Sequence, residues 1–176
     1  MARVIVADDH DALREGMALS LTRLGHEVRA VKGGAEAIAA YRKKPADVVV
    51  TDLRMVPVDG IEVVRRLRAE DPEATVLVVS AHGTIAAAVE AMRAGAIDFI
   101  EKPFPPELLR ARVEKAIEIA CERRGARADR ARAEALDADR VREHDPHGLV
   151  GRSEKPKPGR EGTTRWKLSS SGSALV

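Results

Sequence analysis

The stretch of the chain that decides the fold is VVVTD, residues 48–52. Three consecutive valines predict a strand that is covered on both faces, because a strand with one wet face alternates apolar and polar residues. Short runs rich in β-branched residues recur on either side of it, at 4–7, 28–31, 76–79 and 99–100. We therefore expect five strands, of which the first, third and fourth are buried on both faces.

Each predicted strand is followed by apolar residues at helical spacing. The residues that define the five helices are Leu13, Met17, Leu21 and Leu24; Ala37, Ile38 and Tyr41; Ile61, Val64 and Leu67; Ile85, Val89 and Met92; and Leu109, Val113, Ala116 and Ala120. Helix ends are marked by Gly25, Pro45, Pro72 and Gly95, and Thr84 can cap the fourth helix. Five such repeats predict an α/β fold built on a doubly wound parallel sheet.

The composition fits that fold. Hydrophobic residues make up 44% of the 176 residues, but only 2% are aromatic, so the core is built from Val, Ile, Leu and Ala. The single cysteine, Cys121, excludes a disulfide within the chain and a cysteine-based metal cluster, and it fits a reducing compartment. No apolar run reaches the roughly 18 residues that a membrane span needs. We expect a cytoplasmic protein that does not contact a membrane.

The charge divides the chain into unlike parts. Residues 1–122 hold 17 Lys and Arg against 20 Asp and Glu, whereas residues 123–176 hold 13 against 8. The second part has too few large apolar residues to bury a core. We expect a domain over 1–122, a helical linker over 123–147 and a disordered tail over 148–176. The linker continues the last helix, either as a solvated helix that Gly125 interrupts or as a dimerising coiled coil.

Polar residues follow four of the predicted strands. Asp8 and Asp9 follow the first, Asp52 ends the third, Ser80 ends the fourth and Lys102 follows the fifth. The carboxyl ends of parallel strands meet at one edge of the sheet, where ligands bind. Clustered carboxylates repel one another unless a cation shares the site, and oxygen ligands suit Mg²⁺. The sequence thus predicts a weak Mg²⁺ site in which the central carboxylate, Asp52, accepts a phosphoryl group.

These residues resemble the receiver domain of two-component response regulators over about 120 residues. The matching motifs are Asp8-Asp9, Thr51-Asp52-Leu53-Arg54-Met55 with Asp59-Gly60, Ser80-Ala81, and Asp98-Phe99-Ile100-Glu101-Lys102-Pro103-Phe104. The sequence departs from the family at Met55-Val56-Pro57, where receivers usually have Met-Pro. The resemblance implies a flavodoxin-like sheet with strand order 2-1-3-4-5.

The resemblance also implies a role for each matching residue. Asp52 would be the phosphoacceptor, Asp9 and Asp52 would bind Mg²⁺ directly with the backbone carbonyl of Arg54, and Asp8 would hold a metal-bound water. Lys102 would pair with a phosphoryl oxygen, across a cis Lys102–Pro103 bond. Ser80 would donate its hydroxyl to the phosphoryl group while Phe99 turns inward behind it. The partner that supplies the phosphoryl group would be a sensor histidine kinase.

The motifs are similar to regulators with more than one kind of output domain. The segments 80–104 are similar to NtrC-like receivers, which activate sigma-54 transcription, and Gly148-Leu149-Val150-Gly151-Arg152-Ser153 resembles the start of their ATPase domain. The chain has no GxxxxGK[ST] phosphate loop, so it would be a truncated regulator or a stand-alone receiver. Asp8-Asp9-His10 and Arg14-Glu15-Gly16 are more similar to regulators with a helix-turn-helix output. A homodimer is expected through the fourth helix, fifth strand and fifth helix, or through the extended last helix.

Two other functions compete with this interpretation. An Mg²⁺-dependent phosphohydrolase would also use Asp52 as its nucleophile, but such enzymes usually carry a second acid two residues later, where this chain has Arg54. Direct nucleic-acid binding by the basic tail is expected to be weak and salt-sensitive, because the tail lacks interleaved aromatic residues. His10 and His82 flank the acidic and serine motifs and are interpreted as exposed loop residues.

Overall fold

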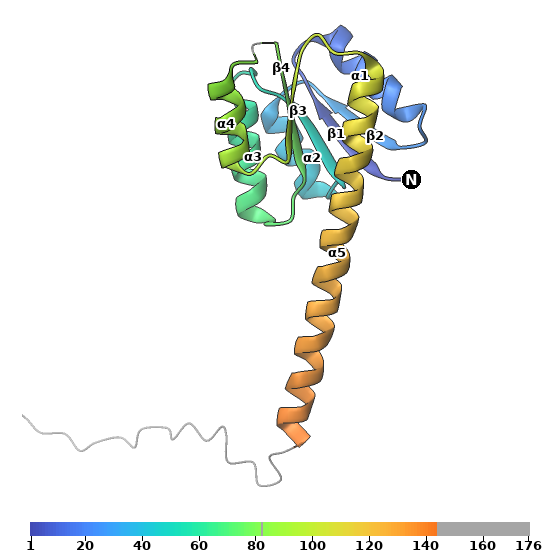
Figure 1. The fold of residues 1–176 in the computed structure, drawn as a ribbon, viewed down its shortest axis with the longest axis vertical. Coiled ribbons are helices and arrows are strands. Elements are labelled where there is room, and N and C mark those ends of the chain that lie inside the picture. The colour runs from blue at the N-terminus through green and yellow to red at the C-terminus, as the bar shows by residue number, and fades with distance from the viewer. Residues whose placement is uncertain (82, 144–176) are drawn as a thin grey trace, which may run out of the picture. The chain divides into compact units, whose positions relative to one another are not determined.

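The valine runs form the strands of one parallel sheet. A computed structural model of the chain describes residues 1–81 and 83–143, and the side chains of 138–143 are not described. The strands are β1 (Arg3–Ala7), β2 (Glu27–Val31), β3 (Val48–Asp52), β4 (Val76–Ser80) and β5 (Asp98–Glu101). Their order is β2-β1-β3-β4-β5, which confirms the doubly wound topology (Figure 1). All five residues of β3 and of β4 are buried, as continuous apolar runs predict.

The strand register aligns the carboxyl ends of the strands. Ala7 pairs with Thr51, Asp52 pairs with Val79, and Ser80 pairs with Glu101. The residues that follow or end β1, β3, β4 and β5 are therefore delivered to the same edge of the sheet.

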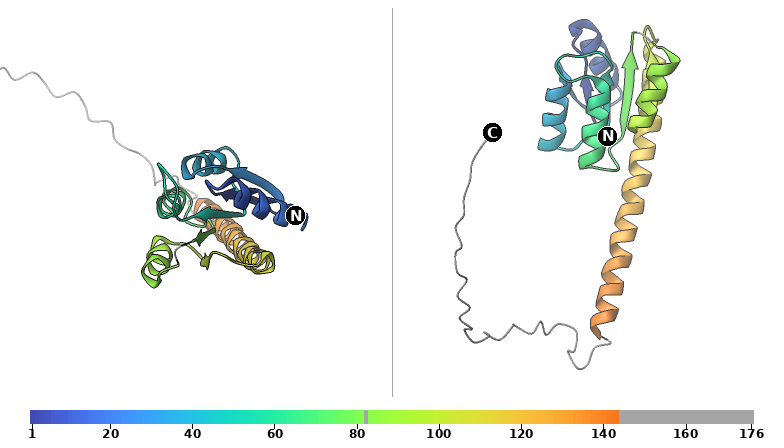
Figure 2. Two further views of the ribbon diagram at one scale, coloured as in Figure 1. Left: turned by 90° about the horizontal axis from the view of Figure 1, so that it is seen from above. Right: turned by 90° about the vertical axis from the view of Figure 1, so that its left-hand side faces the viewer.

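Helices cover both faces of this sheet (Figure 2). The helices are α1 (Asp11–Thr22), α2 (Gly34–Lys43), α3 (Gly60–Glu70), α4 (Ile85–Ala94) and α5 (Pro106–Glu143). On one face, Met17 and Leu21 of α1 and Leu109 and Val113 of α5 pack against the strands. On the other face, a second core cluster contains the buried apolar residues of α2, α3 and α4. Aliphatic side chains and alanine dominate both clusters, in line with the scarcity of aromatic residues.

The helix boundaries follow the local chemistry. The Thr84 hydroxyl accepts a hydrogen bond from the backbone amide of Ala87 at 3.1 Å, so Thr84 caps α4 as predicted. The same helix ends at Gly95, whose φ of 107° lies in the left-handed region that favours glycine. The Lys102–Pro103 and Val56–Pro57 bonds are both cis, and the first was expected.

The apolar residues that predicted α1 and α4 are not all buried. In α1, Leu13 is 44% exposed and the buried positions include Arg14 and Ser20 instead. In α4, Ile85 and Met92 are 86% and 48% exposed, and the buried residue is Ala91. A helix that approaches the sheet closely needs a small residue at the contact, which leaves the larger side chains of α4 facing outward.

Helix α5 is long and continuous across Gly125. The predicted interruption does not occur, because the cost of one glycine in a helix, about 1 kcal/mol, is small beside the helix-forming Ala, Arg and Glu around it. Residues Met1–Ala135 form one compact unit. The predicted tail 148–176, with its Gly148–Ser153 phrase, and His82 lie outside the described residues. Among the helices in the described part of the chain, none combines the length and apolarity needed to cross a bilayer.

Candidate functional site

Two buried carboxylates and one ammonium meet at the carboxyl edge of the sheet. Lys102 Nζ donates to Asp8 Oδ2 and to Asp52 Oδ1, each at 2.6 Å. Asp8 is fully buried, Asp52 is 6% exposed and the Lys102 side chain is 10% exposed. Residues separated by 50 and by 94 positions in the chain thus form one charged cluster. Short charge-assisted bonds of this kind are the strong ones.

The ammonium of Lys102 is held in its charged form. Burial by itself lowers the pKa of Lys102, but the hydrogen bonds to Asp52 and then to Asp8 outweigh it, with their negative charges adding to the effect. The net result is a pKa above the ordinary value for lysine. Lys102 is therefore a permanent cation near neutral pH, suited to binding an anionic group.

The cluster carries more negative than positive charge. Because both carboxylate oxygens lie 2.6 Å from the same nitrogen, they are within about 5 Å of each other. At an effective dielectric constant of about 20, two charges at that separation repel by about 3 kcal/mol. A single ammonium cannot neutralise two carboxylates, so the edge favours the arrival of a second cation.

The oxygen donors at this edge fit Mg²⁺. Asp9 follows Asp8 in an exposed turn, so its carboxylate is open to solvent next to the buried pair. Arg54 lies in the loop after β3, where its backbone amide donates to Asp52 Oδ2 at 2.8 Å. Within the residues that the structure describes, no three His, Cys, Asp or Glu side chains converge as a metal-ligand group. Mg²⁺ needs only one or two carboxylates, since it retains several waters, so the residues present fit this ion.

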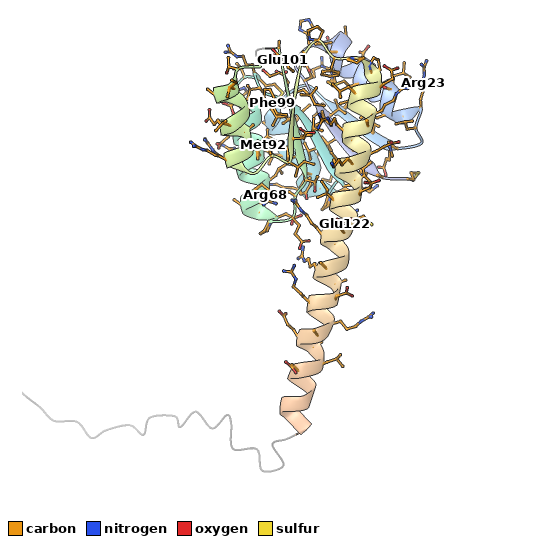
Figure 3. All side chains as sticks on the ribbon, in the orientation of Figure 1. Arg23, Arg68, Met92, Phe99, Glu101 and Glu122 are labelled. Carbon is orange, nitrogen blue, oxygen red and sulfur yellow. The ribbon has the colours of Figure 1, made fainter. Side chains whose placement is uncertain are left out.

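Ser80 and Phe99 lie on the two strands next to this cluster. Ser80 is 1% exposed at the end of β4, and its backbone carbonyl accepts from the Lys102 amide at 2.7 Å. Phe99 pairs with Val78 in the register and is half-buried against the core cluster that contains Ala91 of α4. Figure 3 labels Phe99 on β5 and Met92 on α4. The structure thus brings Asp8, Asp52, Lys102 and Ser80 to one edge, with Phe99 further down β5 toward the α4 side.

A close backbone approach shapes the loop over Asp52. A Cβ atom on Gly60 would collide with the carbonyl oxygen of Asp52, so glycine is required at the start of α3. Asp59 caps the same helix by accepting from the Glu62 amide at 2.8 Å. The Asp59-Gly60 motif therefore anchors the loop that begins at Asp52. The shifted proline, Pro57, lies in the exposed part of that loop.

One residue at this edge was not predicted from the sequence as part of the site. Arg14 is 6% exposed, and its Nη1 donates to the backbone carbonyl of Asp8 at 2.9 Å. The sequence does contain one sign of this role. At helical spacing, Arg14 falls on the same face of α1 as Met17 and Leu21, which is the face that packs into the core. A charged residue on a core-facing position is an exception that requires a partner.

The chain matches known proteins over most of its length. Residues 4–114 match the family described as "Response regulator receiver domain". The chain is 38% identical over 152 residues to the C4-dicarboxylate transport transcriptional regulatory protein DctD of Pseudomonas aeruginosa, covering 86% of this chain and 31% of DctD. It is 37% identical over 105 residues to the chemotaxis protein CheY of Thermotoga maritima, covering 59% of this chain and 88% of CheY.

A solved structure extends the likeness to three dimensions. The receiver domain of NtrX from Brucella abortus superposes with a TM-score of 0.63 at 35% identity, covering 65% of this chain and 98% of that structure. A match of 152 residues in a chain of 176 must also include all of 123–147, so the similarity to DctD continues past the sheet along α5. A transcriptional regulator and a chemotaxis protein thus match the same fold at similar identity.

Proposed function

The chain belongs to the response regulator receiver domain family, and we propose that it accepts a phosphoryl group on Asp52 from a sensor histidine kinase. The observation that supports this most directly is the Lys102 ammonium, which bridges the two buried carboxylates Asp8 and Asp52. A buried acidic site with a fixed cation at its edge can hold a dianionic group that an exposed aspartate could not. The chain spans 31% of DctD, and the proposal concerns the receiver part only.

The transfer is a displacement at phosphorus. A carboxylate oxygen of Asp52 attacks the phosphorus of a phosphohistidine, the new O–P bond forms, the N–P bond breaks, and the departing imidazole takes up a proton. Lys102 would leave Asp52 Oδ1 and pair with a phosphoryl oxygen, since the Asp52 carboxylate loses its charge when its oxygen bonds to phosphorus. Positioning and charge stabilisation carry most of the catalysis in such transfers.

Mg²⁺ is the cofactor that this site would use. Asp9 and Asp52 would bind it directly with the backbone carbonyl of Arg54, and Asp8 would hold one of its waters. When bound, the ion would neutralise the charge that develops on the phosphoryl oxygens. The excess negative charge of the cluster and the solvent-exposed Asp9 support this assignment.

The new contacts are large enough to operate a switch. Phosphorylation adds between about 1.5 and 2 negative charges and new acceptor oxygens. Charge-assisted bonds from Ser80 and Lys102, at roughly 1.5–3 kcal/mol each, would together supply about 3–6 kcal/mol. Reversing a two-state equilibrium from 1:99 to 99:1 takes about 5.5 kcal/mol. Movement of Ser80 toward the phosphoryl group would open space for Phe99, which links the site to the surface of α4.

The proposed output surface consists of α4, β5 and α5. Its support is the exposed apolar face of α4, where Ile85, Val89 and Met92 are 86%, 43% and 48% exposed. Phosphorylation would alter this face and so control a homodimer, a partner protein or transcription. Dimerisation through the extended α5 is the alternative, and light scattering before and after phosphorylation tests both, because either one doubles the mass.

A small phosphodonor tests the chemistry directly. After incubation with acetyl phosphate and Mg²⁺, intact-protein mass spectrometry should detect one phosphoryl group on the wild type and none on Asp52→Asn. Asp59→Asn is the matched control, because it removes an exposed carboxylate from the same loop while Asn retains the helix cap. Label on Asp52→Asn would refute the assignment. Rapid multiple turnover of phosphate esters would instead favour the competing phosphohydrolase.

A further inference from the structure

The Arg14 side chain bonds the backbone directly before Asp9. Its Nη1 donates to the carbonyl oxygen of Asp8 at 2.9 Å, and its backbone amide donates to the carbonyl oxygen of His10 at 2.9 Å. Only the first of these bonds comes from the arginine side chain, because the second is the first backbone bond of α1. Asp8 Oδ1 adds a third bond by accepting from the His10 amide at 2.9 Å.

The burial of Arg14 has no simpler explanation in packing. The residue is 6% exposed and occupies a position where α1 otherwise buries Met17 and Leu21. Its second terminal nitrogen, Nη2, pairs with the carboxylate of Asp11, whose side chain is 67% exposed. That pairing lowers the pKa of Asp11 and balances the buried guanidinium. Replacing a buried ion pair by apolar residues is often neutral or stabilising, so the pair is better explained by what it positions than by stability.

The target of the positioning is the turn that carries Asp9. The carbonyl of Asp8 lies directly before it, and the side chain of Asp8 is already held by Lys102 and the His10 amide. The Arg14 side chain therefore holds the backbone that leads into Asp9, while the Asp9 carboxylate remains exposed. Partners of this kind behind a metal ligand typically contribute 10–100-fold to metal affinity.

We propose that Arg14 is a positioning residue for the Mg²⁺ site, which presets the Asp8–His10 turn so that the Asp9 carboxylate binds the ion without first being ordered. This inference rests on the proposed function, because it takes Asp9 as a Mg²⁺ ligand. Arg14 does not touch the ion or the phosphoryl group. It acts through the backbone of its neighbours.

The charge of Arg14 and its hydrogen bonds should affect Mg²⁺ affinity in opposite directions, and Arg14→Gln removes both. A guanidinium near the acidic cluster repels a divalent cation, so an effect of charge alone means that Arg14→Gln strengthens Mg²⁺ binding. Loss of the positioning bonds means that Arg14→Gln weakens it. Arg14→Lys separates the two further, because lysine retains the charge but lacks the planar fork that reaches the Asp8 carbonyl and Asp11 together.

The experiment is a calorimetric titration of the full chain with MgCl₂, without a phosphodonor. We expect Arg14→Lys and Arg14→Gln each to raise the Mg²⁺ dissociation constant about tenfold. The matched control is Arg110→Lys. Arg110 of α5 donates from its guanidinium to the Ser20 hydroxyl of α1 at 2.8 Å, remote from the Asp8–His10 turn, and the substitution removes this bond. It should leave the constant within about twofold of the wild type. Circular dichroism establishes that each variant is folded, and if Arg14→Gln does not fold, Arg14→Lys decides.

The phosphodonor assay then separates the two proposals. At saturating Mg²⁺, the rate of labelling of Arg14→Lys should return to within about twofold of the wild type, since affinity and not chemistry was lost. Unchanged or tighter Mg²⁺ binding in both Arg14 variants overturns the positioning role. If the wild type binds Mg²⁺ and is labelled, and the Arg14 variants behave in the same way as the wild type, only this inference is refuted. A wild type that is never labelled on Asp52 refutes the proposed function itself.

Discussion

The two ends of the same sheet differ in how their carboxylates are paired with cations. At the carboxyl end, Asp8 and Asp52 share the single ammonium of Lys102. At the amino end, Asp47 pairs with Arg124 of α5 and accepts from the Arg3 amide at 2.6 Å. At the carboxyl end two acids share one cation, whereas at the amino end Asp47 has a cation of its own.

The amino end also contains a carboxylate bonded to a neutral donor. The hydroxyl of Tyr41 donates to Asp71 Oδ2 at 2.8 Å, and burial together with that bond raises the pKa of Tyr41. Tyr41 therefore stays protonated and Asp71 keeps a donor. Each of these two amino-end carboxylates thus has a donor side chain of its own, whereas the two carboxylates at the other end share one ammonium and repel each other until a further cation binds.

The largest expected effect comes from removing the shared cation. Lys102→Met leaves two buried carboxylates with no ammonium, and we expect it to lower the free energy of unfolding by about 3 kcal/mol near neutral pH without Mg²⁺. Urea denaturation followed by circular dichroism measures the change. Added Mg²⁺ should recover part of the loss. Lys115→Met, on the exposed face of α5, is the control and should change stability by less than about 0.5 kcal/mol.

An intermediate effect is expected at the amino end. Asp47→Asn conserves the shape of the side chain but breaks the ion pair with Arg124, and should cost about 1–2 kcal/mol. Because that pair tethers α5 beyond Ala120, hydrogen exchange should become faster for the backbone amides of residues 121–135. Glu62→Gln disrupts only an exposed pair with Arg66 and is the matched control. Equal effects of the two variants would contradict the structural role of Asp47.

The same kind of substitution at the carboxyl end should behave oppositely. Asp8→Asn can still accept from the His10 amide, but it removes one of the two charges that repel each other across Lys102. We expect the free energy of unfolding to stay unchanged or to rise by up to about 1 kcal/mol in the absence of Mg²⁺. Mg²⁺ should stabilise this variant less than it stabilises the wild type. A loss as large as that of Asp47→Asn would remove the distinction between the two ends.

The smallest effect concerns pairs at the amino end whose side chains are exposed to solvent. Hydrogen bonds from Lys44 lower the pKa of Glu27, and those from Arg42 lower the pKa of Glu70. A lowered pKa in the folded state means that the stabilisation is fully present above the unfolded pKa of about 4.5 and is lost as the pH falls through the folded value. Urea denaturation between pH 6 and pH 3 should show a slightly shallower loss of stability for Glu70→Gln. An identical pH profile would show that this pair contributes nothing.

Much of the fold could be predicted from local patterns. The run Val48–Val50 has only one stable environment, a strand buried on both faces, and the same holds for 4–7 and 76–79. The interruption predicted at Gly125 was wrong, because the flanking residues form helix strongly enough to offset a glycine. The buried face of α1 differed from its leucine pattern because Arg14 occupies a core-facing position.

The carboxyl-edge cluster could be predicted as a group but not as a set of contacts. Strand topology brings Asp8, Asp52 and Lys102 together, since parallel strands end at one edge. Which oxygen Lys102 meets depends on the packing of the loop after β5 against β1 and β3, and no local pattern encodes this. The bond from Arg14 to the Asp8 carbonyl has the same origin, because a backbone acceptor is present at every residue and leaves no mark on the sequence.

The sequence alone therefore determined the succession of strands and helices along the chain, the aliphatic core and the edge at which the charged residues gather. Periodicity and the chirality of strand-helix-strand connections are enough for that, because each is a local property repeated along the chain. Only the tertiary structure decided that two carboxylates share one ammonium, that the Arg14 side chain donates to the Asp8 carbonyl, and that the larger side chains of α4 face outward. These depend on distances between segments far apart in the chain, which close packing sets to fractions of an ångström.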